Sequence, residues 1–122
     1  KEDNALNDNE TTLILSEMCY EIERAYSLGL HKDKPVWDDA SEQERLSFMT
    51  RITAYMDRPD LTPEDFHKEW LAAKAKYGWK YGKEKDVKNK KHNLMVPFKH
   101  LPFDEQTKAS VLRATVRQIT GI

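Results

Sequence analysis

Apolar side chains recur at helical spacing in four stretches of the chain. The repeat of three and four residues between apolar positions predicts helices over residues 12–28, 42–56, 63–77 and 104–119. We therefore predict an all-α fold with four helices and no sheet larger than a single hairpin.

Polar and small residues mark where these helices begin and end. Ser41 is followed three residues later by Glu44, which is the pattern of a capping box. Thr62 can cap the third helix, and Pro63 fits its first turn. Gly78 is expected to end that helix, because glycine adopts the left-handed conformation that follows many helices.

A weak internal repeat relates the two halves of the chain. Residues 36–52 and 97–116 each carry an aromatic residue followed by a helix with a Glu-Gln pair in its first turn. This repeat suggests two helix–loop–helix halves related by a pseudo-twofold axis. We expect residues 1–11 to be a flexible N-terminal segment and residues 12–122 to form a single helical domain.

Composition narrows the classes of protein to which the chain can belong. Charged residues make up 34% of its 122 residues and its mean hydropathy is −0.83. No apolar run approaches the length needed to cross a bilayer, so no membrane partner is expected. Cys19 is the only cysteine, which excludes an internal disulfide and fits a cytoplasmic location.

Charge is distributed unevenly along the chain. Residues 1–66 hold 7 basic and 16 acidic residues, a net charge of −9, whereas residues 67–122 hold 13 and 5, a net charge of +8. Two readings stay open. The halves attract each other within the fold or across a homo-oligomer, or the basic half faces an anionic ligand.

The segment from residue 67 to residue 98 combines aromatic rings with lysines. Aromatic faces beside cations suit a flat, negatively charged ligand such as a nucleotide. Trp70 and Trp79 are the strongest candidates for stacking on a base, and Tyr81 lies close by in the sequence. Ordinary core packing is the alternative role for both tryptophans.

Lysines of the same segment are candidates for binding phosphate. Lys74 follows Trp70 by one helical turn and would lie beside the same ring, although a solvated surface lysine is the alternative. Six further lysines lie between residues 80 and 91. Glu84 and Asp86 interrupt this run, which argues against a nucleic-acid partner.

Four short motifs in this region resemble one known family. They are His67-x-x-Trp70, Gly78-Trp79-x-Tyr81-Gly82, Lys90-Lys91-His92 and Val96-Pro97-Phe98. Their order and spacing resemble the RyR domain, a module that is repeated in ryanodine receptors and also occurs as small stand-alone proteins of bacteria and phages. The specific motifs lie within residues 66–119.

The resemblance implies a helical fold and a binding function. Some members of the family are thought to bind nucleotides, and bacterial members are suspected ligand sensors in anti-phage signalling. By this analogy, a phage protein of this type would sequester a host immune signal. His67 and His92 match family positions and would orient the pocket, with a structural hydrogen bond as the alternative role of each. Trp37 would close the far side of the pocket if the internal repeat holds.

Motifs of catalysis and metal binding are missing from the sequence. The four histidines and Cys19 lack zinc-finger spacing, and no nucleophile elbow, Walker loop or dinucleotide fingerprint occurs. We therefore predict a non-catalytic protein without metal or cofactor that binds a nucleotide or a nucleotide-derived signalling molecule. The alternative is a protein-interaction module that docks a partner through its aromatic and basic surface.

Overall fold

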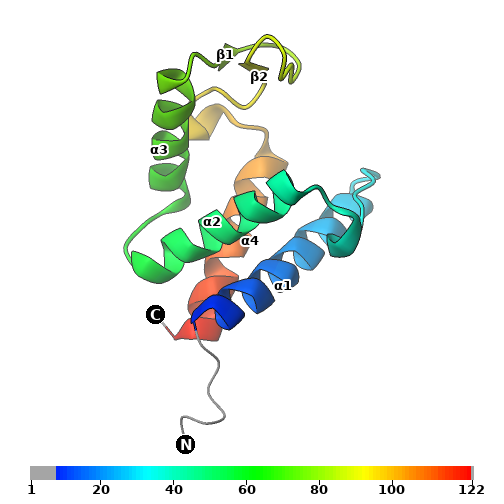
Figure 1. Ribbon diagram of the computed structural model, residues 1–122, viewed down its shortest axis with the longest axis vertical. Coiled ribbons are helices and arrows are strands. Elements are labelled where there is room, and N and C mark those ends of the chain that lie inside the picture. The colour runs from blue at the N-terminus through cyan, green and yellow to red at the C-terminus, as the bar shows by residue number, and fades with distance from the viewer. Residues whose placement is uncertain (1–7, 122) are drawn as a thin grey trace, which may run out of the picture. The chain divides into compact units, whose positions relative to one another are not determined.

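The computed structural model describes residues 8–121, and four α-helices dominate it (Figure 1). The mostly α-helical fold predicted from the sequence is confirmed. In chain order the elements are α1 (Asp8–Gly29), η2 (Trp37–Asp39), α2 (Glu42–Asp57), α3 (Pro63–Lys76), β1 (Lys80–Tyr81), β2 (Lys91–His92), η3 (Phe98–His100) and α4 (Phe103–Thr120), where η denotes a 3-10 helix. None of the described helices is long and apolar enough to span a membrane.

The helices begin and end close to the predicted positions. α2 and α3 start where expected, and α4 starts one residue earlier. α1 begins at Asp8, so residues 8–11 of the segment expected to be flexible are helical, and residues 1–7 lie outside the described part of the chain. The only sheet among the described residues is the β1–β2 pair, which is parallel and therefore not a hairpin.

The predicted caps explain these boundaries. The Ser41 hydroxyl accepts a hydrogen bond from the Glu44 amide at 3.1 Å, which is one half of the predicted capping box, while the Glu44 carboxylate lies 3.7 Å from Lys34 Nζ. Thr62 and Asp65 form a reciprocal capping box, in which each side chain accepts from the other residue's amide, at 3.1 and 3.3 Å. Gly78 has a φ of 88°, so the chain turns out of α3 at the glycine that the sequence predicts.

The chain divides into two compact units. Unit 1 contains the residues up to Asp60 and those from Val111 onward, and unit 2 contains Leu61–Ser110. α4 therefore supplies its first residues to unit 2 and its last residues to unit 1. The pseudo-twofold relation between the sequence halves stays a prediction.

Unit 1 has a closed apolar core. α1 and α2 pack against each other and run in opposite directions (Figure 1). The buried side chains of unit 1 come from these two helices, from Ala40 in the loop between them and from the second half of α4; they are Leu15, Ser16, Cys19, Tyr20, Ser27, Ala40, Phe48, Ile52, Tyr55, Leu112 and Val116. Fully burying a side chain of this size contributes roughly 1.5–3 kcal/mol, so this core supplies most of the stability of unit 1.

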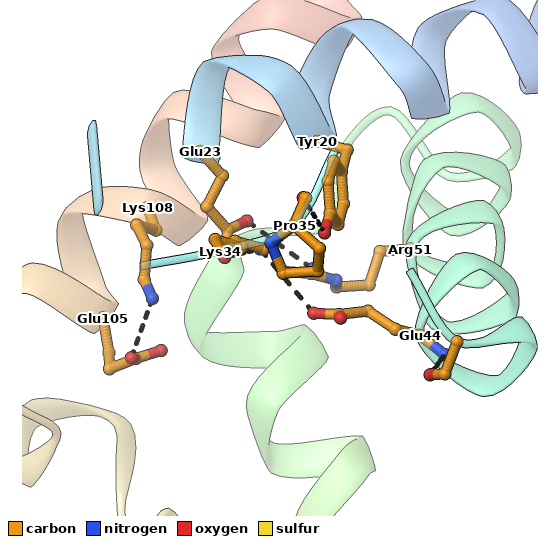
Figure 2. Close-up of polar contacts among 9 residues, drawn as sticks. Tyr20, Glu23, Lys34, Pro35, Glu44, Arg51, Glu105 and Lys108 are labelled. Atoms are coloured by element: carbon orange, nitrogen blue, oxygen red, sulfur yellow. Dashed lines mark hydrogen bonds and ion pairs between the residues drawn. The ribbon is translucent and has the colours of Figure 1, made fainter. Parts of the chain in front are cut away.

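A buried tyrosine holds the loop between α1 and α2. The Tyr20 hydroxyl donates to the Pro35 carbonyl at 2.7 Å (Figure 2). The Tyr20 ring meets Phe48 edge to face at 5.2 Å and Trp37 at 5.5 Å. Trp37 is thus half-buried in unit 1 as a packing partner of Tyr20.

Ion pairs reinforce the same loop. Lys34 Nζ lies 3.3 Å from Glu23 Oε1 on α1 and 3.7 Å from Glu44 Oε2 on α2 (Figure 2). The same ammonium lies 4.4 Å from the centre of the Tyr20 ring. Arg51 Nη2 lies 3.8 Å from the second oxygen of Glu23. The side chains of Lys34, Glu23 and Arg51 are only 13–23% exposed, so their attraction is screened less than that of surface pairs, whereas Glu44 is 41% exposed.

Unit 2 is built differently. α3 packs against η3, and the β1–β2 pair follows the C-terminal end of α3 (Figure 1). Among the described residues of unit 2, only Leu61 and Leu101 are fully buried. The remaining packing comes from half-buried aromatic and polar side chains, which form the candidate site.

Candidate functional site

One face of α3 presents three of the predicted site residues. His67, Trp70 and Lys74 are separated by three and four residues, so they lie along the same side of the helix. The capping box at the start of α3 and Gly78 after its end fix the length of this face. All three side chains are half-buried.

His67 is fixed against Trp70 by a backbone hydrogen bond. Its ring stacks on the Trp70 indole at 5.4 Å with an angle of 21° between the planes. Its Nε2 lies 2.7 Å from the Val96 carbonyl oxygen. A carbonyl can only accept, so Nε2 carries a proton and donates it. One face of Trp70 is consequently covered by a side chain of the protein itself.

The short parallel sheet brings His92 to the same place. Tyr81 pairs with His92 and Lys80 pairs with Lys91. The His92 ring stands nearly perpendicular to Trp70, at 5.0 Å and 82°, and lies 6.2 Å from Trp79. Residues that are distant in the sequence thus join the face of α3.

His92 is held in its neutral form. Burial first, and then the positive charges of Lys85 and Lys74, lower the pKa of His92 below its ordinary value. Its Nδ1 accepts a hydrogen bond from the Leu94 amide at 3.1 Å. The proton of the neutral ring therefore lies on Nε2, which is available as a donor.

The ammonium group of Lys74 lies against the rings of two tryptophans. Its Nζ lies 4.3 Å from the centre of the Trp79 ring and 5.8 Å from that of Trp70. Cation–π contacts of this kind contribute about 0.5–1 kcal/mol when partly exposed. Within residues 8–121 no carboxylate forms an ion pair with Lys74, so its charge is available to an anion.

Five of the predicted site residues therefore form one group, which we call the aromatic cluster: His67, Trp70, Lys74, Trp79 and His92. Tyr81 is the strand partner of His92 and is 55% exposed. Trp37 belongs to unit 1, and its proposed contribution to the pocket stays a prediction.

The loop that carries His92 has a defined shape. The Asp86 carboxylate accepts from the Asn89 amide at 3.2 Å and from its side chain at 2.7 Å. These hydrogen bonds lower the pKa of Asp86. The backbones of Asp86 and Lys91 exchange two hydrogen bonds of 2.8 and 2.9 Å. Asp86 thus builds the turn, in addition to interrupting the run of lysines.

Gly82 is required by close packing within the sheet. A Cβ atom at Gly82 would lie 2.6 Å from the Lys91 Cβ and 3.2 Å from its Cγ. Lys91 therefore lies across the glycine, and any other residue would push the two strands apart. This contact explains the second glycine of the Gly-Trp-x-Tyr-Gly motif.

Two groups that shape the site carry no signal in the sequence. The Val96 carbonyl and the Leu94 amide fix the two histidines, and both are backbone groups. Lys90 Nζ donates to the Tyr77 carbonyl at 2.8 Å and ties the loop to the end of α3. Within the described residues, no three His, Cys, Asp or Glu side chains are grouped to hold a metal ion.

The fold and the aromatic cluster define a small helical domain with an aromatic and basic site. The family model of the RyR domain matches residues 47–121 of the chain. This match covers more than half of the sequence, so the chain belongs to the RyR domain family. It begins within α2 and includes all of unit 2, which confirms the resemblance found in the loop motifs.

Proposed function

We propose that this protein binds a nucleotide or a nucleotide-derived signalling molecule without converting it. The observation that carries the proposal is the aromatic cluster, in which Lys74 lies on the Trp79 ring beside Trp70 and two histidines. A base would stack on an exposed part of an indole or on Tyr81. The Lys74 ammonium and the Nε2 proton of His92 would meet a phosphate.

The proposed biological role follows from binding without turnover. A protein that holds a signalling molecule lowers the free concentration of that molecule. In a phage-encoded member of the family, this activity would sequester a host immune signal in the host cytoplasm. The RyR domain match and the cluster support this reading together.

Thermal shift and calorimetric titration test the proposal. A ligand that binds only the folded protein at a hundred times its Kd adds about 2.7 kcal/mol of stability, which raises Tm measurably. A panel of mono-, di- and cyclic nucleotides is titrated, and each ligand is recovered afterwards by chromatography. A well-folded protein that shows neither heat nor a Tm shift with any of them contradicts the proposal, and a converted ligand contradicts its non-catalytic part.

A protein partner is the second candidate. Four large apolar side chains of unit 2 are strongly exposed: Tyr77 by 67%, Tyr81 by 55%, Val87 by 65% and Phe103 by 80%. Exposed apolar groups beside lysines suit a partner with an apolar and acidic surface. If no nucleotide binds, a protein-interaction function becomes the favoured proposal. The partner would then be sought with a photo-crosslinking residue placed at position 103.

Self-association belongs to the same proposal. The charges of −9 and +8 on the two sequence halves favour contacts between copies that weaken as salt increases. Sedimentation at low and high salt measures this dependence. A dimer that is equally stable at both salt concentrations contradicts the electrostatic origin.

A further inference from the structure

We propose that the aromatic cluster recognises one phosphoryl group of its nucleotide, whatever the length of the phosphate chain, and that Lys74 and Lys85 are the lysines that contact it. The inference rests on the proposed function and adds how many phosphoryl groups the site contacts and which lysines contact them. The inference is based on which lysine side chains of unit 2 point toward the aromatic cluster and which point away from it.

The two faces of the β1–β2 pair separate the lysines. Successive side chains of a strand point to opposite faces. Lys80 pairs with Lys91 and Tyr81 pairs with His92, so the two lysines share one face. His92 contacts both tryptophans of the cluster, whereas the side chain of Lys91 packs across Gly82. Lys80 and Lys91 therefore emerge on the face that points away from the aromatic cluster.

A third lysine of the loop is already engaged. Lys90 Nζ donates to the Tyr77 carbonyl, so its ammonium stabilises the C-terminal end of α3. A ligand bound at the cluster would consequently contact fewer positive charges than the number of lysines in the loop suggests.

Two other lysines carry their charge near the cluster. Lys74 lies over Trp79. Asp86 and Lys91 form an antiparallel bridge with two backbone hydrogen bonds. Lys85 and His92 are the neighbours of these two residues in the chain, so both lie on the face opposite to Lys91. The positive charge of Lys85, like that of Lys74, accordingly acts to lower the pKa of His92. Two ammonium groups match a phosphate monoester, which carries about −1.5 to −2 charges at pH 7. Additional phosphates would extend into solvent, where salt screens their attraction.

The first experiment needs no variant. Adenosine, AMP, ADP and ATP, and the matching guanosine series, are titrated into the wild-type protein by calorimetry at fixed salt. We expect AMP or GMP to bind at least about tenfold more tightly than its nucleoside, since hydrogen bonds to an ionised phosphate are stronger than neutral ones. Di- and triphosphates should bind within about threefold of the monophosphate.

The second experiment compares two pairs of lysines. The double variant Lys74→Met, Lys85→Met removes both charges at the cluster and keeps unbranched chains of similar length. The control Lys80→Met, Lys91→Met removes the same charge from the opposite face. We expect the first variant to weaken monophosphate binding by about tenfold or more and the control by less than about twofold. Circular dichroism melting verifies that both remain folded.

The outcomes distinguish this inference from the function on which it rests. If no nucleotide or nucleoside binds, the proposed function fails and the inference fails with it. If nucleotides bind but affinity rises with each added phosphate, the inference alone is overturned. Equal losses in the two double variants overturn it as well.

Discussion

The two units of the chain are packed by different means. In unit 1, side chains such as Leu15, Ile52 and Val116 are 0–1% exposed, and their burial fixes the arrangement of the helices. In unit 2, rings such as Trp70 and His92 are half-buried and are held by ring contacts and backbone hydrogen bonds. The first arrangement encloses the Tyr20 and Phe48 rings in the core, while the second leaves aromatic rings and lysine charges partly accessible. Burial therefore dominates the packing of unit 1, whereas ring contacts and backbone hydrogen bonds dominate the packing of unit 2.

The largest expected effect is on the core of unit 1. Phe48→Ala should lower the free energy of unfolding by about 3–5 kcal/mol, because the ring is 2% exposed and its removal leaves a cavity. Urea denaturation measures the change. A loss below about 1 kcal/mol would mean that unit 1 is not packed more tightly than unit 2.

Trp70→Ala should separate binding from stability. Because the indole is half-buried, we expect a loss of about 2 kcal/mol of stability, less than the range for a fully buried ring. Nucleotide affinity should fall by about one to two decades, since stacking on an aromatic ring is worth about 1–3 kcal/mol. Paired melting and titration of the variant check both numbers. A loss of stability as large as that of Phe48→Ala, with unchanged affinity, would make Trp70 a core residue only.

Gly82→Ala should disturb unit 2 alone. The added methyl group meets the Lys91 Cβ at 2.6 Å, so the strands must separate, at a cost of about 1–3 kcal/mol. Gly29→Ala is the matched control, because a Cβ atom added at Gly29 would have no neighbour within 4 Å. That variant should be neutral or more stable by about 0.4–1 kcal/mol. Hydrogen exchange locates the effect, and equal losses in the two variants would argue against close packing at the sheet.

The smallest effect concerns pH. The folded state lowers the pKa of His92 below its ordinary value of 6.5, so the unfolded chain binds the proton more readily. The stability that the folded state gains from keeping His92 neutral is therefore complete above pH 6.5. It is lost as the pH falls from 6.5 toward the lowered pKa. Lys85, Lys74 and His67 oppose the proton and Glu105 favours it. His92→Gln should flatten the pH dependence of Tm between about pH 7 and pH 5. If the slope of Tm against pH is unchanged in this variant, other titratable groups cause the pH dependence.

Much of the fold could be predicted from local signals. Thr62, Pro63 and Gly78 act within a few residues of their own positions, so the limits of α3 are readable from the sequence. The spacing of His67 and Trp70 likewise places them on one helix face. Helix caps and helical periodicity depend on neighbours in the chain, which a single sequence contains.

The remaining features depend on distant backbone. The pairing of Tyr81 with His92 joins residues through two-residue strands, which are too short for any periodic signal. The partner of His67 is the carbonyl of Val96, and a carbonyl is the same in every residue. The sequence shows how many lysines the loop contains but not which face of the sheet each one occupies. That direction depends on register, and register becomes visible only in three dimensions.

The distribution of the tryptophans between the units has a consequence for spectroscopy. Trp37 is in unit 1, whereas Trp70 and Trp79 are in unit 2 beside imidazole and ammonium groups. The chain has three tryptophans in total. In a Trp37→Phe variant, the indole emission would come from unit 2 alone, and its wavelength and intensity would follow the surroundings of the aromatic cluster. The protein therefore contains its own optical reporter of the proposed site, without an attached dye.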